Sequence, residues 1–243
     1  MLFRLPLLAA FLALLPAPLA AQSYTIVTEE WIEEVPASRY VSTQHEAVER
    51  NALAAFGPFR MIDARTAALV DVTDARAPAH FAALLAAYPQ VEVLEFVEAP
   101  GTHDDVANLE VGRMIRAHGL ATSAPAGGSV RSGAVELFLA GTARSIDPES
   151  EFAVHGWLDD RGRGAEDYPA SAPEHRRYLD YYAEMGMAAD AARAFYAMTN
   201  SVPFEEALWL TGSEMRGWIG AEETPRVTLA PSLAMLDFQP VLP

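Results

Sequence analysis

The amino-acid sequence predicts an α/β domain made of repeated strand–strand–helix units, with added helices on its C-terminal side. Short stretches rich in β-branched and aromatic residues alternate with stretches of helical spacing from residue 59 to residue 123, which indicates ββα or βαβ units in one domain. After residue 173, two amphipathic helical stretches follow one another without a strand between them. Apolar residues make up 51% of the 243 residues, which is enough to fill one core.

Each element is assigned from its local pattern. The predicted helix over 104–119, for example, carries Val111, Met114 and Ile115 at helical spacing and ends at Gly119. Helices are predicted over 46–56, 78–88, 104–119, 135–140, 174–187, 188–199 and 211–218, with one more helical turn within 203–210. Strands are predicted over 59–62, 67–72, 91–97, 120–123 and 152–155, and loops over 125–128, 146–151 and 156–173.

Residues 1–21 have the pattern of a secretory signal peptide, with an early cation, an apolar run and small residues at the end. The apolar run is interrupted by prolines and is too short to span a bilayer comfortably. We therefore expect cleavage after Ala21, no stable membrane anchor, and a periplasmic or secreted mature protein; the alternative is an uncleaved anchor. The rest divides into a lead-in over 22–57, one domain over 58–225 and an extended tail over 226–243.

The composition excludes several kinds of chemistry. The chain has no cysteine and no lysine, so disulfides, thiolate catalysis, Schiff bases and lysine-dependent dyads are ruled out. Its formal net charge of −16 disfavours nucleic acids and anionic membrane surfaces as partners. His103, Asp104 and Asp105 fit the loop before a helix more simply than a metal site, and we expect neither a metal nor another cofactor.

The segment 131–157, RSGAVELFLAGTARSIDPESEFAVHGW, holds the candidate catalytic residues. Ser132 stands at the predicted start of an apolar helix, where free backbone N–H groups and the positive dipole end favour an oxyanion. His155 ends the next predicted strand and can take the serine proton if the fold brings the two within hydrogen-bond reach. The simpler alternatives are a helix-capping serine and a strand-end histidine bonded to a backbone carbonyl.

Four segments in order resemble the Clp protease proteolytic-subunit family, and most closely its secreted, Clp-like periplasmic branch within the ClpP/crotonase superfamily. They are VLEFVEAPGTHDDVANLEVGRMIRAHGL at 93–120, SGAVELFLAGTAR at 132–144, EFAVHGW at 151–157 and VPFEEALWLTGSEMRGWIGAEE at 202–223. These look like the family's strand, Pro-Gly-Gly turn and helix, its nucleophile helix, the strand of its general base, and the segment of its third triad member. The resemblance covers about two-thirds of the chain and implies ClpP/crotonase-like repeated ββα units in a single domain, with added C-terminal helices.

The resemblance also implies roles for individual residues. Ser132 would be the nucleophile and His155 the general base. The backbone N–H groups of Gly133 and Thr102 would hold the oxyanion, because Thr102 stands where the family has its second glycine. The expected function is that of an exported, ATP-independent serine hydrolase, in the first place a peptidase, acting on a peptide or small ester and associating into a homo-oligomer.

Three positions depart from the family pattern. The third triad member is assigned to Glu206, with Glu205 as the neighbouring candidate, where the family has an aspartate; a glutamate needs its backbone placed further from the histidine. Thr102 in place of glycine can close the pocket or exclude a positive φ. Arg131 puts a large cation directly before the nucleophile. The alternative function is therefore that of a catalytically inactive, Clp-like protein that binds peptides or partners. Crotonase-type acyl-coenzyme A chemistry is a third option, which export disfavours.

Overall fold

The computed structural model describes residues 43–159 and 161–223. The predicted signal segment over 1–21, most of the lead-in over 22–57 and the tail over 226–243 lie outside these residues. Within the described ranges, none of the helices has the length and apolar character needed to cross a membrane.

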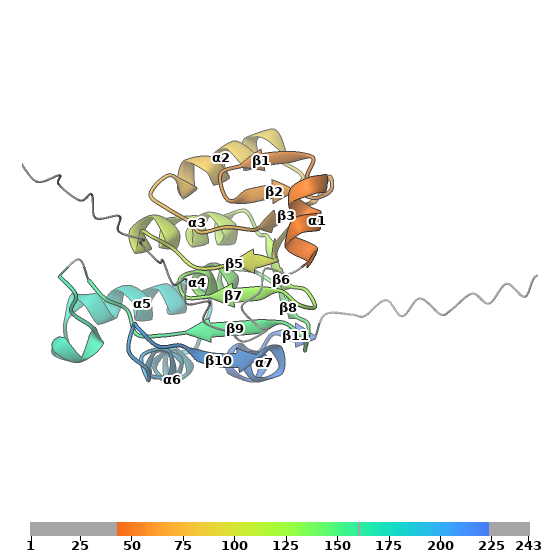
Figure 1. Ribbon diagram of the computed structural model, residues 1–243. Helices are drawn as coiled ribbons and strands as arrows, with labels where there is room; N and C mark the ends of the chain where they lie inside the picture. Colours follow the sequence, from red (N-terminus) through yellow and green to blue (C-terminus); the bar gives the residue numbers. More distant parts are fainter. Residues whose placement is uncertain (1–42, 160, 224–243) are drawn as a thin grey trace, which may run out of the picture. The chain divides into compact units, whose positions relative to one another are not determined.

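Helices and strands alternate along the described chain, and Figure 1 labels them. The helices are α1 (Thr43–Asn51), α2 (Ala77–Ala87), α3 (Asp105–Ala117), α4 (Ala134–Leu139), α5 (Pro173–Glu184), α6 (Ala189–Thr199) and α7 (Gly212–Ile219), with a short 3-10 helix, η2 (Ala165–Asp167). The strands are β1 (Ala54–Phe56), β2 (Phe59–Met61), β3 (Thr66–Leu69), β4 (Val93–Phe96), β5 (Glu98–Ala99), β6 (Ala121–Ala124), β7 (Ser129–Arg131), β8 (Arg144–Ile146), β9 (Glu151–Val154), β10 (Leu208–Thr211) and β11 (Glu222–Glu223).

The strands of the described residues form two sheets. The larger sheet has seven strands in the order β1-β2-β3-β4-β6-β8-β11, antiparallel from β1 to β3 and parallel from β3 to β11. The smaller sheet has four strands in the order β10-β9-β7-β5. In it β5, β7 and β9 are parallel, and β10 joins the edge antiparallel to β9. Figure 1 shows these four strands one above another, from β5 to β10.

The two sheets arise from a repeated unit of two strands and a helix. One unit is β4, β5 and α3, the next is β6, β7 and α4, and the third is β8, β9 and α5. In each unit the first strand joins the larger sheet and the second strand joins the smaller one. Because the helix returns the chain to the same end each time, successive strands of a sheet are parallel. The predicted α/β fold of repeated ββα units with added C-terminal helices is confirmed.

Helix α4 packs between the two sheets. All of its residues are buried, and it contacts β6 of the larger sheet as well as β7 and β9 of the smaller one. The ring of Phe138 meets Phe96 of β4 and Phe152 of β9 edge-on, with centroids 5.3 and 5.4 Å away. Burying an aromatic side chain contributes roughly 1.5–3 kcal/mol. The start of α4, where Ser132 was predicted to act, is therefore held by the core itself.

Helix α3 shows how the sequence fixes an element next to the site. Asp104 caps it, because its side chain accepts a hydrogen bond from the N–H of Ala107 at 2.9 Å. Val111 and Ile115 are buried, as their spacing predicted. The helix stops before Gly119, whose φ of +70° suits a helix end. The predicted helix over 104–119 is thus confirmed within the usual uncertainty of helix ends.

Some short elements differ from the prediction. The helical turn expected within 203–210 is wrong for its last residues, because β10 begins at Leu208 and pairs with β9. The helix expected over 46–56 ends at Asn51, and β1 follows and pairs with β2, so the sheet includes residues before the predicted domain start at 58. Strands β7 and β8 were not predicted. Strands of three or four residues carry too little periodicity to be recognised, and their pairing partners decide their conformation.

Candidate active site

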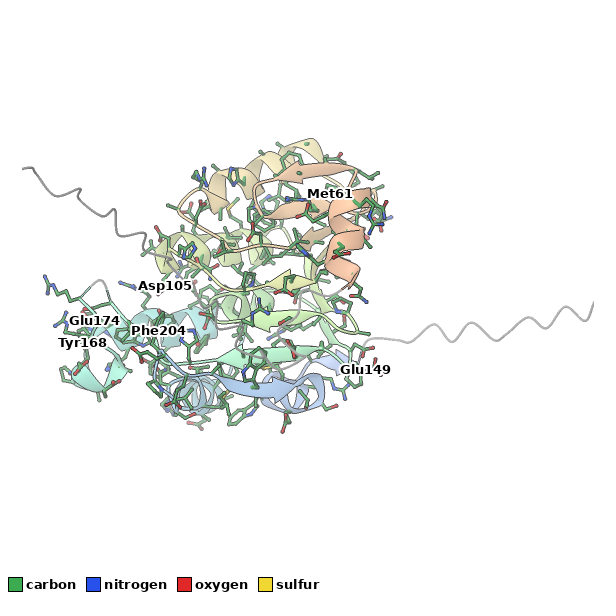
Figure 2. All side chains as sticks on the ribbon, viewed as in Figure 1. Met61, Asp105, Glu149, Tyr168, Glu174 and Phe204 are labelled. Carbon is green, nitrogen blue, oxygen red and sulfur yellow. The ribbon has the colours of Figure 1, made fainter. Side chains whose placement is uncertain are left out.

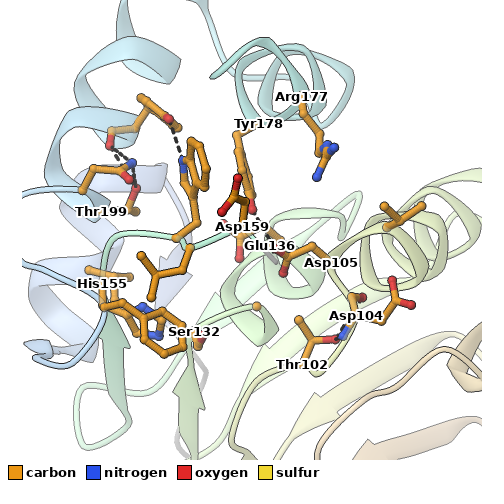
Figure 3. A pocket seen from close by; sticks show the side chains of 18 of the residues that line it. Thr102, Asp104, Asp105, Ser132, Glu136, His155, Asp159, Arg177, Tyr178 and Thr199 are labelled. Carbon is orange, nitrogen blue, oxygen red and sulfur yellow. Dashed lines mark hydrogen bonds between the residues drawn. The ribbon is translucent and has the colours of Figure 1, made fainter. Parts of the chain in front are cut away.

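Three adjacent parallel strands of the smaller sheet end at predicted site residues. Gly101 and Thr102 follow β5, Ser132 follows β7, and His155 follows β9. The N–H of Ser132 donates to the carbonyl of Ala153 at 2.8 Å, which continues the pairing of β7 with β9. Adjacent strands lie about 4.8 Å apart, so this edge of the sheet puts Ser132 between His155 and the Thr102 turn (Figure 3). The carboxyl ends of parallel strands are where α/β sheets bind ligands.

Ser132 has a strained backbone. Its φ is +49°, and it is the one residue other than glycine with a positive φ in the described part of the chain. An L-residue in this region costs roughly 1–2 kcal/mol. The sharp turn leads from β7 directly into α4, which is how a strand-to-helix elbow exposes a nucleophilic serine. The packing of α4 between both sheets compensates for this strain.

Gly101 lets the neighbouring turn approach Ser132 closely. Its φ is +129°, and a Cβ at this position would lie 2.9 Å from the Cβ of Ser132 and 3.4 Å from its Oγ. Thr102 does not adopt a positive φ. Its methyl group instead faces Gly133, where an added Cβ would lie 2.5 Å from that methyl carbon. The threonine is thus accommodated, and the close approach is made by the glycine before it.

Two backbone N–H groups remain available beside Ser132. Within the described residues, the N–H groups of Thr102 and Gly133 donate no hydrogen bond, and both residues line the same cavity as Ser132. The N–H that follows a nucleophilic serine and a second one from a facing loop are the donors that hold an oxyanion in acyl transfer. The structure therefore brings both predicted donors to the serine.

A buried chain of hydrogen bonds connects Gly133 with the turn at Gly101. Asn108 of α3 is 1% exposed, and its Nδ2 donates to the carbonyl of Gly133 at 2.6 Å. Its Oδ1 accepts a hydrogen bond from the hydroxyl of Thr73 at 2.9 Å. The N–H of Thr73 in turn donates to the carbonyl of Gly101 at 3.0 Å. Gly133 and the Gly101 turn are therefore held in register by one chain of hydrogen bonds.

His155 is oriented by a backbone carbonyl. Its Nδ1 lies 2.8 Å from the carbonyl oxygen of Gly156, which can only accept, so Nδ1 carries the proton and Nε2 of the neutral ring is free to accept one. The ring also meets Phe204 edge-on, with centroids 4.8 Å apart. In the residues that the structure describes, the hydroxyl of Ser132 forms no hydrogen bond with His155. Such bonds are often long before substrate binds.

Glu206 and Arg131 lie away from the cavity. Glu206 is exposed on the turn before β10 and makes no hydrogen bond or ion pair through its side chain within the described residues; its neighbour Glu205 is equally exposed. Arg131 forms an ion pair with Glu98 of β5 and donates to the hydroxyl of Ser129 at 2.7 Å. Its charge is thereby neutralised behind the nucleophile, and neither Glu206 nor Arg131 is among the residues that line the cavity.

The cavity at this edge of the sheet has a volume of about 660 Å³, enough for a peptide side chain and its neighbouring backbone. One wall, which we call the nucleophile wall, consists of Thr102, Ser132, Gly133 and His155. The opposite wall comes from the segment after β9 and from α5 and α6. Figure 3 shows the two walls facing each other across the pocket.

The opposite wall, which we call the aromatic wall, is formed by Trp157, Tyr178 and Tyr196, supported from outside by Tyr168 and His175. The indole of Trp157 stacks on Tyr178 with centroids 6.0 Å apart and donates to the hydroxyl of Tyr196 at 2.7 Å. The predicted loop over 156–173 thus contributes directly to the cavity through its first residues.

Glu136 is a charged residue within the buried helix α4, and it also lines the cavity. The hydroxyl of Tyr182 donates to its Oε1 at 2.9 Å. Burial raises the pKa of this carboxyl group to about 7, although the hydrogen bond from Tyr182 opposes the shift. Figure 3 shows Glu136 near Asp105 and Tyr178 in the middle of the pocket.

Sequence reasoning missed several of these residues. Glu136 could have been noticed, since it is the one acid in the apolar run AVELFLAG and stands four positions after Ser132, a spacing that returns to the same helix face. Asn108 gives no such signal, because a polar residue on an amphipathic helix is ordinary. The role of the Gly156 carbonyl in orienting His155 could not be predicted from side-chain types, because every residue has a backbone carbonyl.

No protein-family model matches this chain, and no curated protein matches it. Solved structures that resemble it include a mutant of ClpP1 from Listeria monocytogenes, with a TM-score of 0.47, 15% identity and coverage of 68% of this chain and 94% of that one. Two mutants of the 1510-N membrane-bound stomatin-specific protease, one of them in complex with a substrate peptide, have TM-scores of 0.44 at 15% identity, covering 64% of this chain and 74% and 77% of theirs. The fold assignment itself rests on the two sheets and the repeated ββα units described above.

Proposed function

We propose that this protein is a serine hydrolase that cleaves peptides, with Ser132 as the nucleophile and His155 as the general base. The observation that supports this most is the edge formed by β5, β7 and β9. There a strained serine, a histidine with a free Nε2 and two unpaired N–H groups meet at one cavity. An ordinary capping serine explains neither the positive φ nor the close approach of Gly101.

In the proposed mechanism, the Oγ of Ser132 attacks the carbonyl carbon of the substrate and its proton passes to Nε2 of His155. The N–H groups of Thr102 and Gly133 hold the oxyanion, and one such donor contributes about 10²–10³ in rate. The imidazolium then gives its proton to the leaving amine. Water, activated by the same histidine, hydrolyses the acyl-enzyme and restores the serine.

The carbonyl of Gly156 takes the orienting role that was predicted for Glu206. It fixes the tautomer of His155 by accepting the Nδ1 proton, which is one function of the acid in a triad. A neutral carbonyl stabilises the imidazolium less than a carboxylate does. We therefore propose a Ser–His dyad that works more slowly than a full triad.

The second candidate function is a protein of the same fold that binds peptides without cleaving them. The missing carboxylate at His155 and the absence of a Ser132–His155 hydrogen bond among the described residues favour it. In this case the cavity keeps its binding role, and the two N–H groups hold a peptide carbonyl.

A fluorophosphonate probe distinguishes these functions, because it reacts covalently only with an activated serine. We expect the full chain to be labelled at Ser132, as shown by mass spectrometry of the labelled peptide, and labelling to disappear in Ser132→Ala. Ser213→Ala is the matched control, since Ser213 is an exposed serine of α7 outside the cavity. His155→Ala should slow labelling strongly. A wild-type protein that stays unlabelled under conditions that label a known serine hydrolase would exclude the enzyme and favour the binding protein.

We also propose that the protein is exported and belongs to the secreted branch of Clp-like proteins. It would then act in a compartment in which ATP is absent. The signal-peptide pattern of residues 1–21 supports this. N-terminal sequencing of the protein recovered from an exporting host should begin at Gln22. A chain that retains Met1 and stays inside the cell would contradict it.

A further inference from the structure

The proposed mechanism gives no role to Glu136, although this residue lines the cavity beside Ser132. Glu136 is 9% exposed. The hydroxyl of Tyr182 donates to its Oε1, and the carboxyl group also accepts a hydrogen bond from its own backbone N–H. A carboxylate this deeply buried is costly in its charged form, and a cationic ligand that pairs with it reduces that cost.

The other acids that line the cavity already have partners. Asp104 caps α3, Asp105 accepts a hydrogen bond from Tyr178 at 2.8 Å, and Asp159 forms an ion pair with Arg163. Among the four acids, Glu136 is the one that is buried, so its charge is the one that a bound cation would stabilise most.

The charge of the cavity favours a cation. Four carboxyl groups line it, and the basic residues among the lining residues are Arg177 and two histidines, His103 and His155. Arg177 is exposed on α5 and forms no ion pair with another described residue, so the carboxyl groups outnumber the one permanent cation that lines the cavity with them. A cavity lined by one sign of charge concentrates ligands of the opposite sign.

The position of Glu136 fits a long side chain. Glu136 stands in the first turn of α4, Ser132 lies just before that helix, and both residues line the same cavity. The carboxyl group therefore lies close enough to the serine for an extended lysine or arginine side chain to span the separation. A residue whose carbonyl carbon sits at the Oγ of Ser132 can therefore bring its cationic group to the carboxylate.

We propose that the cavity binds the lysine or arginine side chain of the residue on the acyl side of the cleaved bond, and that Glu136 is the carboxylate that selects it. This inference rests on the proposed function, because the carbonyl held at Ser132 sets where the side chain enters. The cation pairs with the buried carboxylate, and arginine can contact both of its oxygens at once.

The selection should depend on pH. Burial raises the pKa of Glu136 to about 7, so the carboxyl group is charged above that value and neutral below it. The groups that face it are the hydroxyls of Tyr178 and Tyr182 of α5, which stay protonated because burial raises their pKa values, and Asp105 of α3, whose charge raises the pKa further. Preference for a cation should therefore grow as the pH rises through about 7.

Binding to the full-length Ser132→Ala protein tests the proposal without requiring cleavage. The probes are a blocked peptide amide ending in arginine and the same peptide ending in citrulline, which has nearly the same shape and no charge. Above the pKa of Glu136, calorimetry should show about 10- to 100-fold tighter binding of the arginine peptide, the effect of a hydrogen bond to a charged group. About 1.5 pH units below that pKa, the ratio should fall towards one.

Glu136→Gln in the same background should remove the preference, because the amide keeps the size and the contact with Tyr182 but not the charge. Asp159→Asn is the matched control and should retain it, since Asp159 is already paired. Equal binding of the two peptides by the protein with Glu136 intact, or a preference that survives Glu136→Gln, would overturn the inference. Absence of fluorophosphonate labelling in the wild type would count against the proposed reaction only, because the binding comparison does not depend on it.

Discussion

The nucleophile wall and the aromatic wall face the same cavity but are held by different forces. The nucleophile wall is fixed by backbone hydrogen bonds and by the buried Thr73–Asn108–Gly133 chain. The aromatic wall is held by ring packing, by the hydrogen bond from Trp157 to Tyr196 and by the half-buried ion pair of Asp159 and Arg163. Residues set by strands and helices are placed more precisely than residues on loops, and Trp157 and Tyr168 lie between β9 and α5, outside both elements.

This difference fits a division of work between reaction and recognition. Acyl transfer needs the serine, the histidine and the oxyanion donors at fixed distances, because a shift of about 1 Å can cost about 10² in rate. A surface that accepts varied peptides gains from side chains that can move. We therefore expect substitutions that disturb the nucleophile wall to lower both the reaction rate and the stability, and those in the aromatic wall to affect mobility first.

The largest effect should come from Gly101→Ala. The new Cβ would lie 2.9 Å from the Cβ of Ser132, at a φ of +129° that L-residues rarely adopt. We expect a loss of roughly 2–4 kcal/mol in the free energy of unfolding and a fall in labelling rate of at least about 100-fold. Urea denaturation and probe kinetics measure the two effects.

Gly127→Ala is the matched control for that substitution. Gly127 also has a positive φ, +71°, but an added Cβ would have no neighbour within 4 Å. It should lose only about 1 kcal/mol of stability and keep the labelling rate. Equal rates for the two variants would show that the close approach of residue 101 to the serine has no bearing on reactivity.

An intermediate effect is expected for Thr73→Val, which keeps the shape of the side chain and removes the hydroxyl that donates to Asn108. Thr122→Val is its counterpart, because the hydroxyl of Thr122 is also buried and donates to the carbonyl of Phe138 at 2.8 Å. Each should cost about 1–3 kcal/mol of unfolding free energy. Only Thr73→Val should lower kcat, by about tenfold at unchanged KM. Equal losses of kcat in the two variants would show that the Thr73–Asn108–Gly133 hydrogen bonds do not position the reacting groups.

The smallest effect should follow Tyr168→Phe in the aromatic wall. This change removes the hydroxyl that donates to Asp159 and leaves the ring against Trp157. Because the Tyr168 side chain is partly exposed to solvent, we expect a nearly unchanged melting curve and faster hydrogen exchange in the backbone of 161–173. A lower melting temperature of the whole domain would contradict this, because it would show that the aromatic wall contributes to global stability as the nucleophile wall does.

The parts that could be predicted from the sequence are those with long patterns. Helix α3 was recognised from the spacing of Val111 and Ile115. The places of Ser132 before a helix and of His155 after a strand were also predicted, whereas their catalytic roles stay predictions. Strand β7 has three residues and could not be recognised, although it is what sets Ser132 beside His155. Glu206 was assigned because a carboxylate was expected there, whereas Nδ1 of His155 contacts the carbonyl of Gly156, an atom that every residue has.

The left-handed backbone at residue 132 also bears on how this chain can change over time. Glycine adopts such a φ without a steric penalty, so for folding alone glycine suits this position better than serine. A lineage that stopped using the hydroxyl would lose nothing by that replacement and would relieve the turn. A serine here thus goes against the preference of its own backbone, and under the proposed function we expect relatives of this chain with glycine at this position to have lost the reaction.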